Sequence, residues 1–377
     1  MDIRKFPFDK DKFNQMAAYH FGSNWPVVYV IENGKQMYIG QTTNLLGRSR
    51  QHIVDPARVR AKWVHTLTDD DFNLSSAYDF ESLLIQYVAG DGVFKLQNEN
   101  KGLVSHNYYE RERYQAKLSA IWPTLKKMGL VRRDIGDIKN SNLFKFSPFK
   151  ALSTDQERIA EKLEVQIKSG QIGTNIVNGG PGTGKTVLAL YLLKRFVDLK
   201  MARRLKVALV VPMTSLRGTL RTVASQVPGL RADQVIGPGD VVKQKYDLLL
   251  VDEAHRLHRR VNLPNYGSYD ETNRKMGLDR EATQLDWVVG SSSRQIIFYD
   301  RGQTVQPGDV RHLDFDGLDA NHFELTSQMR VAGGEDYLQF IEDLFSLKDV
   351  SDREPWDYDF KLCDDISEML AAIKAKN

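Results

Sequence analysis

An eight-residue glycine-rich segment constrains the fold of this chain more than any other part of it. Gly-Gly-Pro-Gly-Thr-Gly-Lys-Thr occupies residues 179–186, after an apolar stretch at 174–177 and before a helical pattern at 185–199. Glycines allow a tight loop whose backbone N–H groups face an anion. The helix that follows adds the positive end of its dipole. A strand, this loop and a helix therefore predict a phosphate-binding site in an α/β domain.

The loop has the Walker A pattern, which predicts a role for each of its polar residues. Gly179, Gly182 and Gly184 give the backbone its close approach to the phosphates. Lys185 is expected to neutralise the β- and γ-phosphates, and the hydroxyl of Thr186 to ligate Mg²⁺. The cofactor expected at this loop is ATP with Mg²⁺.

Two adjacent carboxylates supply the second half of the predicted nucleotide site. Asp252 and Glu253 directly follow the apolar stretch Leu248–Val251. An acidic pair is usually solvated surface, but the end of a buried strand is where a nucleotide site needs one. Asp252 is expected to hold Mg²⁺ through water, and Glu253 to orient or deprotonate the attacking water.

Short apolar stretches alternate with helical patterns after residue 153, which predicts a parallel sheet covered by helices on both faces. The expected strands are 174–177, 207–211, 248–251 and 295–299, with a capped helix starting at Ser153 or Thr154. We expect this RecA-like P-loop domain to occupy residues 153–377.

The N-terminal part predicts a second, smaller α/β domain at residues 1–130, with a mixed sheet and packed helices. Two strands at 27–31 and 36–39 flank Asn33-Gly34, a strong hairpin signal. Helical patterns follow at 45–52, 77–89 and 108–128. Residues 131–152 are polar and without periodicity, so we expect a linker there.

The second domain resembles the superfamily 1 helicases, specifically a bacterial group of Schlafen-like helicase domains, over residues 150 to about 345. Gln156 looks like the adenine-reading glutamine of that superfamily. Residues 212–216 match the segment that contacts single-stranded nucleic acid. Gln303 matches the glutamine that senses the γ-phosphate, and Arg330 the arginine that reaches it.

A helicase of this superfamily has two RecA-like lobes, and only 47 residues follow Arg330. A further lobe needs roughly 100–150 residues. The chain is therefore expected either to be truncated or to have lost the second lobe, and not to unwind duplex DNA processively. A homo-oligomer or a partner would then supply the second lobe or its arginine finger.

The N-terminal domain resembles the GIY-YIG nuclease family over residues 25–100. Val27-Val28-Tyr29 and Tyr38-Ile39-Gly40 match the two motifs on the hairpin strands, with Val27-Val28 replacing Gly-Ile. The resemblance continues through four residues, which are Arg48, His52, Glu81 and Asn98. It implies a catalytic arginine at 48, a metal-binding glutamate at 81 and the family's late asparagine at 98.

Phosphodiester hydrolysis needs a cation, an activated water and a positive group for the phosphorane, and these residues fit that chemistry. Glu81 can hold Mg²⁺ or Mn²⁺, and Arg48 offers fork-shaped donors to the phosphate. Tyr29 can accept the water's proton if Arg48 or the metal lowers its pKa. Tyr38 is expected to orient the nucleophile or phosphate, and His52 is a candidate second base. Taken singly, each also fits an ordinary strand or helix residue.

Charge and composition favour a polyanionic partner and a reducing compartment. Residues 1–145 hold 21 Lys and Arg against 16 Asp and Glu, a mildly basic balance that suits nucleic acid, although a solvated surface also explains it. The basic residues at 58, 60 and 62 either touch a nucleic-acid backbone or form a solvated helix face. The chain has one cysteine, no secretory signal and no apolar run of membrane length, so we expect a cytoplasmic protein without membrane contact.

The sequence therefore predicts a metal-dependent endonuclease that cleaves DNA and is gated by ATP binding or hydrolysis. By fold-level analogy alone, such a fusion fits an anti-phage or DNA-processing arrangement. Two alternatives stay open, which are an ATP-dependent nucleic-acid-binding or sensor module with a degenerate nuclease site and a nuclease that acts on RNA.

Overall fold

The structure is a computed structural model. It describes residues 1–58, 60–98, 108–199, 205–304, 306–327, 334–348, 361 and 363–376. The chain divides into two compact units. The first comprises Met1–Gly180 and Lys185–Leu325, and the second comprises Pro181–Gly184 and Thr326–Asn377. The predicted α/β part at residues 1–130 lies in the first unit, as do residues 153–180 and 185–325 of the second predicted part.

The N-terminal part is built on a mixed five-stranded sheet of order β1-β4-β2-β3-β5. Its strands are β1 (Asp2–Pro7), β2 (Ser23–Glu32), β3 (Gln36–Asn44), β4 (Trp63–Thr68) and β5 (Lys95–Leu96). Neighbouring strands are antiparallel except β3 and β5, which are parallel. The predicted hairpin is β2–β3, and of its turn residues Gly34 takes the positive φ, at 84°. The mixed sheet is confirmed.

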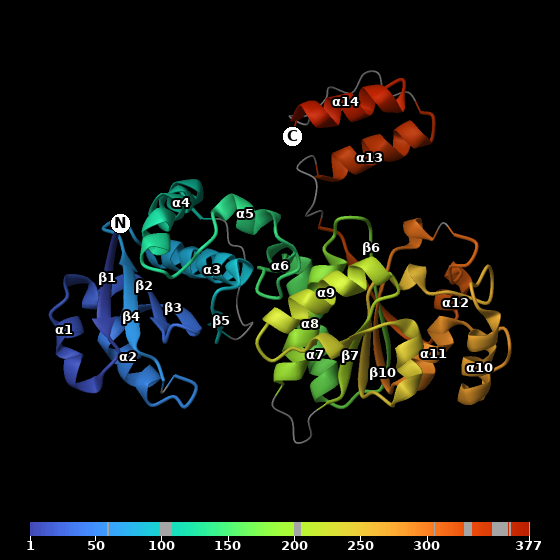
Figure 1. The fold of residues 1–377 in the computed structure, drawn as a ribbon, viewed down its shortest axis with the longest axis horizontal. Coiled ribbons are helices and arrows are strands. Elements are labelled where there is room, and N and C mark those ends of the chain that lie inside the picture. The colour runs from blue at the N-terminus through green and yellow to red at the C-terminus, as the bar shows by residue number, and fades with distance from the viewer. Residues whose placement is uncertain are drawn as a thin grey trace. The chain divides into compact units, whose positions relative to one another are not determined.

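Helices cover both faces of this sheet. They are α1 (Asn14–Ala17), α2 (Leu45–Ile53), α3 (Leu74–Asp91) and α4 (Arg111–Lys127). Alternate residues of β2 face opposite sides, as the strand period requires. Val28 and Val30 pack on the α3 side, and Val27 and Tyr29 pack on the side of α1 and α2. Helices α4, α5 (Ile135–Asn140) and α6 (Asn142–Lys145) pack against α3 (Figure 1).

The nucleotide-binding part is built on a parallel six-stranded sheet of order β11-β6-β10-β9-β7-β8, which confirms the RecA-like prediction. Its strands are β6 (Gly173–Gly179), β7 (Val207–Val210), β8 (Val235–Ile236), β9 (Leu248–Val251), β10 (Arg294–Tyr299) and β11 (Ala320–Leu325). One face is covered by α7 (Thr154–Lys168), α8 (Lys185–Asp198) and α9 (Thr214–Gln226). The other is covered by α10 (Tyr266–Met276), α11 (Gln284–Ser291) and α12 (His312–Asp316).

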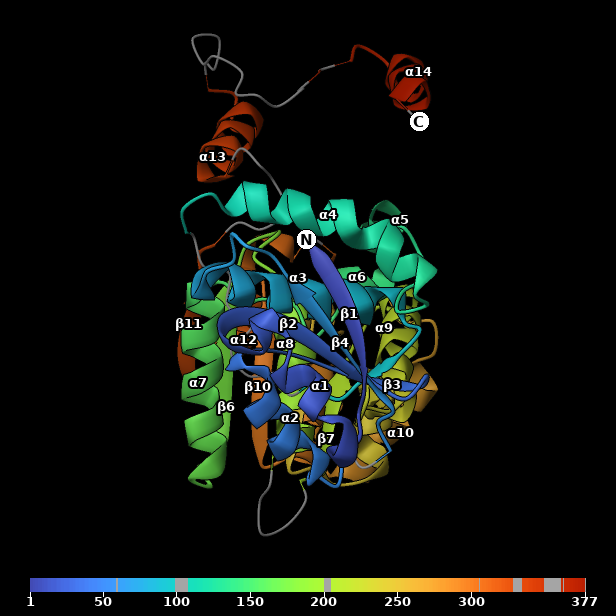
Figure 2. The same cartoon turned by 90° about the vertical axis from the view of Figure 1, so that its left-hand side faces the viewer.

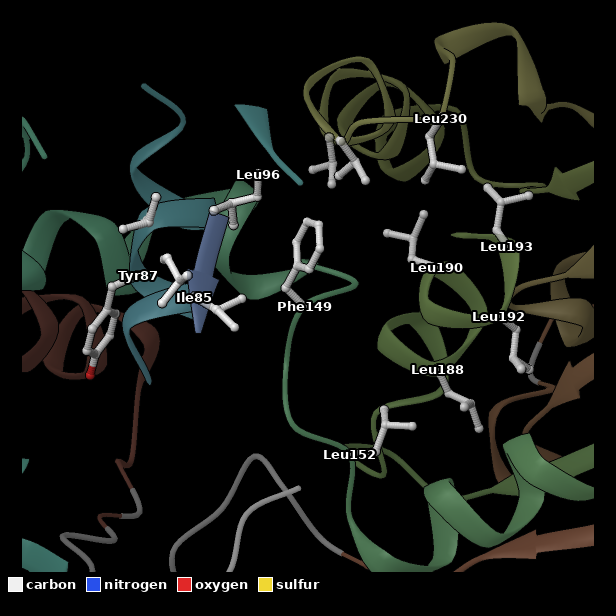
Figure 3. Close-up of a cluster of buried hydrophobic side chains, with 14 of the residues drawn as sticks. Ile85, Tyr87, Leu96, Phe149, Leu152, Leu188, Leu190, Leu192, Leu193 and Leu230 are labelled. Carbon is white, nitrogen blue, oxygen red and sulfur yellow. The ribbon is translucent and has the colours of Figure 1, made fainter. Parts of the chain in front are cut away.

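Residues 131–152 differ from the predicted irregular linker, because they form α5 and α6 and bury several apolar side chains. Ile138, Phe149 and Leu152 are all buried in the same hydrophobic cluster. Figure 3 shows Phe149 between Leu96 of the N-terminal part and Leu190 of α8. The α3 side of the first sheet and the α8 side of the second therefore share one continuous core.

The second unit contains helices α13 (Gly334–Phe345) and α14 (Ile366–Lys376). Within the described ranges, no helix has both the length and the apolar character needed to cross a bilayer.

Candidate functional site

Two groups of polar residues stand out in the first unit, one in each of its parts. The carboxyl ends of β6, β9 and β10 meet at one edge of the parallel sheet, because the strands run in the same direction. Lys185 follows β6 by way of the glycine loop, Asp252 follows β9, and Asp300 follows β10.

Lys185 is buried and its ammonium is held by three oxygens. Its Nζ donates to the carbonyl oxygens of Gly179 at 2.5 Å and Gly180 at 2.9 Å, and lies 3.2 Å from Oδ2 of Asp300. Within the loop, Gly182 and Gly184 have φ of 84° and 78°, a conformation that L side chains disfavour. The lysine therefore lies where the pattern predicts it. Its ammonium can exchange these oxygen acceptors for the oxygens of a phosphate.

Asp300 links the lysine to the predicted γ-phosphate sensor. Its Oδ2 also accepts a hydrogen bond of 2.7 Å from Nε2 of Gln303. Asp300 is 3% exposed and was not among the predicted site residues. A carboxylate at the end of the strand beside β6 is the sequence signal that could have identified it.

Asp252 is fully buried, and neither of its oxygens has a well-formed hydrogen bond. Burial raises the pKa of Asp252 to about 7, and the charge of Glu253 raises it further, while nearby Thr186 and Lys185 oppose the rise. A buried carboxylate without partners is costly unless a cation meets it. Together with the Thr186 hydroxyl, this donor set fits Mg²⁺ bound to a nucleotide.

Glu253 adopts a left-handed conformation with φ of 51° and pairs with His255, whose Nε2 lies 2.9 Å from its carboxylate. Burial favours the neutral acid, but His255 outweighs it, so the pKa of Glu253 lies below its usual value. The carboxylate is therefore ionised at neutral pH, as a water-orienting base must be. His255 is a second residue that the sequence reasoning missed.

Gln156 and Arg330 are the remaining residues that the sequence predicts to contact the nucleotide. Gln156 is completely buried at the start of α7, where its Oε1 accepts a 3.1 Å hydrogen bond from the Ser153 N–H. This bond belongs to a capping box. Arg330, the predicted phosphate-reaching arginine, lies outside the described residues.

The candidate nuclease residues gather around the hydroxyl of Tyr29. Tyr29 Oη lies 2.8 Å from Nε2 of His52, and Nε of Arg48 donates to it at 3.2 Å. Arg48 and His52 are one turn apart on α2, so they reach the same point. The Tyr38 ring lies 4.8 Å from the His52 ring. Four predicted residues are thus brought together.

Gly40 makes room for this cluster. It pairs directly with Tyr29 across β2 and β3. A Cβ at position 40 would overlap the Tyr29 hydroxyl and the carbon that bears it. Any larger residue would push the ring away from Arg48 and His52.

The protonation states of the cluster differ from the sequence-based expectation. Burial raises the pKa of Tyr29 well above its usual value, and Tyr38 adds to this, while Arg48 only partly opposes it. Tyr29 therefore keeps its proton at neutral pH, and Arg48 alone does not make it a base. Burial lowers the pKa of His52 to about 4, with help from Arg58 and Arg48, so the imidazole is neutral and can accept a proton.

Glu81 lies on α3 and is partly buried beside this cluster, close enough for Arg48 and Tyr29 to feel its charge. Burial raises the pKa of Glu81 to about 7, and Arg48 opposes that rise. No group of three or more His, Cys, Asp or Glu side chains suited to a metal occurs in the described part of the chain.

Asn98 is placed away from the Tyr29 hydroxyl, on the backbone of β3. Its Oδ1 accepts from the Ile39 N–H at 3.1 Å, and its Nδ2 donates to the Ile39 carbonyl at 2.7 Å. These two bonds fix the strand that carries Tyr38 and Gly40. The geometry gives Asn98 a supporting contact.

Arg58 is a further member that the sequence reasoning left as a surface residue. It follows α2 in a turn, pairs with Asp55, and places its guanidinium carbon 3.9 Å from the Tyr38 ring centre. Its side chain is 12% exposed, so it does not form a solvated helix face. Only its contact with Tyr38, which is a long-range one, reveals this position.

Comparison with solved structures gives only distant likeness. A chain described as part of two coordinating Pif1 helicases at forked double-stranded DNA is 16% identical with a TM-score of 0.29, over 53% of this chain. This chain spans about half (49%) of that helicase chain. Domain III of the Thermotoga maritima replication initiation protein DnaA is 14% identical with a TM-score of 0.27, over 53% of this chain and 74% of that chain. No curated protein matched.

The comparison with protein families gives a direct match to the second part of the chain. The model of the Schlafen group 3 DNA/RNA helicase domain matches residues 174–377. This stretch includes the glycine loop, the Asp252-Glu253 pair and Gln303, and it confirms the predicted helicase-type P-loop domain. It does not reach the cluster around Tyr29. By this match over more than half of its length, the chain belongs to the Schlafen group 3 DNA/RNA helicase domain family.

Proposed function

We propose that the N-terminal part is a metal-dependent DNA endonuclease and that ATP binding or hydrolysis in the helicase-type domain controls it. The observation that carries the proposal is the convergence of Arg48 and His52 on the hydroxyl of Tyr29, with Glu81 beside them. A strand tyrosine kept for its packing needs neither two polar partners on a facing helix nor a glycine opposite its hydroxyl.

The arrangement supports a proton path for hydrolysis. The oxygen of a water attacks phosphorus, and its proton passes to Tyr29 as Tyr29 gives its own proton to Nε2 of His52, 2.8 Å away. His52 is neutral because its pKa is about 4, so its Nε2 has a lone pair for the proton, and as a weak base it then releases that proton to solvent. The P–O bond to the leaving oxygen breaks, and that oxygen takes a proton from water.

Arg48 and Glu81 would stabilise the negative charge that develops on the phosphate in this scheme. Arg48 faces the reacting oxygens with a guanidinium that can stabilise the phosphorane. Glu81 would hold a divalent cation, which when bound polarises the phosphate. Tyr38 contacts His52 and Arg58, and in this scheme it would orient the phosphate or the water.

Control by nucleotide is supported by the shared core. Glu81 lies on α3, whose apolar side chains belong to the same cluster as those of α8, the helix that starts at Lys185. A change in the position of α8 on nucleotide binding would therefore act on α3 through direct packing.

The test is incubation of the full chain with plasmid DNA, with and without ATP and with Mg²⁺ or Mn²⁺. We expect metal-dependent nicking that changes with ATP and disappears in Glu81→Ala. Arg48→Ala should abolish it equally while ATP binding persists. Absence of nicking by the unaltered chain under all of these conditions would reject the nuclease and favour a nucleic-acid-binding or sensor role.

RNA is the second candidate substrate, since the family description includes both DNA and RNA. Matched DNA and RNA oligonucleotides of one sequence would separate the two. Preferential cleavage of RNA would correct the substrate while leaving the chemistry in place.

A further inference from the structure

The positive charge of the N-terminal half is concentrated in one short segment. Residues 1–125 hold 15 Lys and Arg against 14 Asp and Glu, a net of +1, whereas residues 126–150 hold seven against two, a net of +5. The second range comprises the end of α4 together with α5 and α6. Both views place α5 and α6 beside α3, the helix that carries Glu81 (Figures 1 and 2).

Three lysines of this segment lie around two stacked aromatic rings. Tyr87 of α3 and Phe144 of α6 stack with their ring centroids 5.5 Å apart and an angle of 18° between the planes. The ammonium of Lys139 lies over the Tyr87 ring at 5.8 Å, and that of Lys150 over the Phe144 ring at 5.2 Å. Lys145 is the last residue of α6. We call Lys139, Lys145 and Lys150 the lysine surface.

The charge of the lysine surface is not neutralised within the described part of the chain. None of its three ammonium groups forms an ion pair with a residue that the structure describes. Of the two acids in the segment, Asp134 pairs with Lys126 at 2.7 Å, and Asp137 is the other. Burial lowers the pKa of Lys150, and the charge of Lys145 lowers it further. A bound anion would relieve this repulsion, because an opposite charge favours the charged form.

The neighbouring elements do not cancel this charge. Helix α9, which packs against α6, contains no Asp or Glu. At the end of α3, Asp91 is 8% exposed and accepts the backbone N–H groups of Arg132 and Arg133. Counted together with Arg133, Asp91 and Asp137, the three lysines still leave four positive charges against two negative ones.

The chemistry of the lysine surface suits a phosphate backbone better than exposed bases. An ammonium on a flexible stem acts on phosphate as a point charge and carries no sequence information. Proteins that hold a single strand stack its bases on accessible aromatic rings. Here Tyr87 is only 8% exposed and already stacks on Phe144. A duplex keeps its bases inside and presents phosphates, so it needs only the cations.

The lysine surface also lies within reach of the candidate nuclease site. Tyr87 follows Glu81 by six residues on α3, roughly 9 Å along the axis at 1.5 Å per residue. Phosphates follow one another about every 3.4 Å along the axis of each strand. One duplex can therefore meet both Glu81 and the lysine that lies over Tyr87.

We infer that the lysine surface binds the phosphate backbone of duplex DNA beside the bond that the candidate nuclease site would cut. The inference rests on the proposed function, which it deepens by naming where the substrate is held. Contacts of this kind position a duplex without selecting its sequence.

The test removes the two exposed lysines, as Lys139→Gln combined with Lys145→Gln. Binding of a short fluorescent duplex to the full chain is measured by anisotropy at several salt concentrations, without divalent metal or ATP. Loss of two phosphate contacts should weaken binding about tenfold to a hundredfold near about 0.1 M salt, and should lower the slope of log affinity against log salt by about two. Lys139→Arg combined with Lys145→Arg keeps both charges and should bind like the unaltered chain.

The control removes two exposed lysines elsewhere. Lys162 of α7 and Lys206 before β7 are both exposed, and neither forms an ion pair with a described residue. Lys162→Gln combined with Lys206→Gln makes the same change in net charge, and we expect its affinity and salt slope to match those of the unaltered chain. Thermal unfolding should differ little between the two double variants, because all four side chains are exposed.

The outcomes separate this inference from the proposed function. If the glutamine variant of the lysine surface binds the duplex with the affinity and salt slope of the control, the inference is overturned, whether or not plasmid is nicked. If it binds weakly and the unaltered chain never nicks, the lysine surface stands and the nuclease proposal falls. The inference is also overturned if the unaltered chain binds a single strand more tightly than the duplex, or binds phosphatidylserine vesicles through these lysines but no duplex.

Discussion

The two candidate sites satisfy their polar groups in opposite ways. At the nucleotide site, Asp252 is fully buried, and neither of its carboxylate oxygens has a well-formed hydrogen bond. At the Tyr29 cluster, the tyrosine hydroxyl forms hydrogen bonds with both Arg48 and His52. A buried carboxylate suits cation binding, because a buried charge is costly unless an opposite charge pairs with it. A cluster whose polar groups bond to one another fits a catalytic role and a structural role equally well. Only substitution of its residues separates these two roles.

Tyr29→Phe gives the largest expected effect and tests the satisfied cluster. If the Tyr29 hydroxyl carries a proton, cleavage should fall about 10²–10⁴-fold, while stability falls by about 1–3 kcal/mol for the two hydrogen bonds lost at that hydroxyl. Nicking rates and urea unfolding are measured on the same samples.

Tyr19→Phe is the matched control, because its buried hydroxyl lies 2.8 Å from Thr68 Oγ1 away from the cluster. Equal losses of stability with unchanged nicking in both variants would make Tyr29 a structural residue.

Lys185→Ala tests the nucleotide site and should weaken ATP binding by about tenfold to a hundredfold, the worth of one charged hydrogen-bonding group. It should leave metal-dependent nicking measurable in the absence of ATP. Calorimetric titration with ATP is the measurement, with the exposed Lys243→Ala as control. Unchanged ATP affinity would remove Lys185 from the site.

Asp252→Asn tests the contrast between the two sites, because it removes the buried negative charge of the nucleotide site. The nucleotide-free chain should become more stable by about 1–3 kcal/mol, because burying a neutral amide costs less than burying a carboxylate. Stabilisation by ATP with Mg²⁺ should be lost at the same time. Thermal unfolding with and without that ligand measures both, and a variant less stable than the parent would contradict the assignment.

The smallest expected effect is the contribution of His52 to the pH dependence of stability. Its pKa of about 4 lies below the unfolded value of 6.5, so its contribution to stability is present above pH 6.5 and declines as pH falls towards 4. Between about pH 7.5 and about pH 5.5 the chain should lose about 1 kcal/mol from this group. Urea unfolding at the two pH values measures it, and His52→Asn should lose correspondingly less.

The sequence predicted the elements that carry local patterns and missed those defined by distant partners. The glycine loop, β9 and α3 follow from spacing and periodicity. Strand β4 pairs with both β1 and β2, yet Trp-Val-His-Thr-Leu-Thr shows no strict alternation to indicate it. Phe149 and Leu152 are isolated apolar residues in a polar stretch, so their burial could not be read from any period.

The same division holds within the sites. Lys185, Thr186 and Asp252 belong to motifs, and the structure brings them to one edge of the sheet. Asp300 ends a predicted strand, but its contact with Lys185 joins residues far apart in the sequence. The contact of Arg58 with Tyr38 is one that no local pattern encodes. The raised pKa of Tyr29 also escaped prediction, because burial by the whole domain causes it.

The core around Phe149 bears on how such a chain could have been assembled by recombination. A crossover anywhere in residues 131–152 would leave one half of this core exposed on each product. A new N-terminal partner for the helicase-type domain would need to supply apolar side chains that match Leu190 and Leu230. Exchange of the N-terminal part among relatives is therefore constrained by packing at the junction, and compensating substitutions should concentrate there.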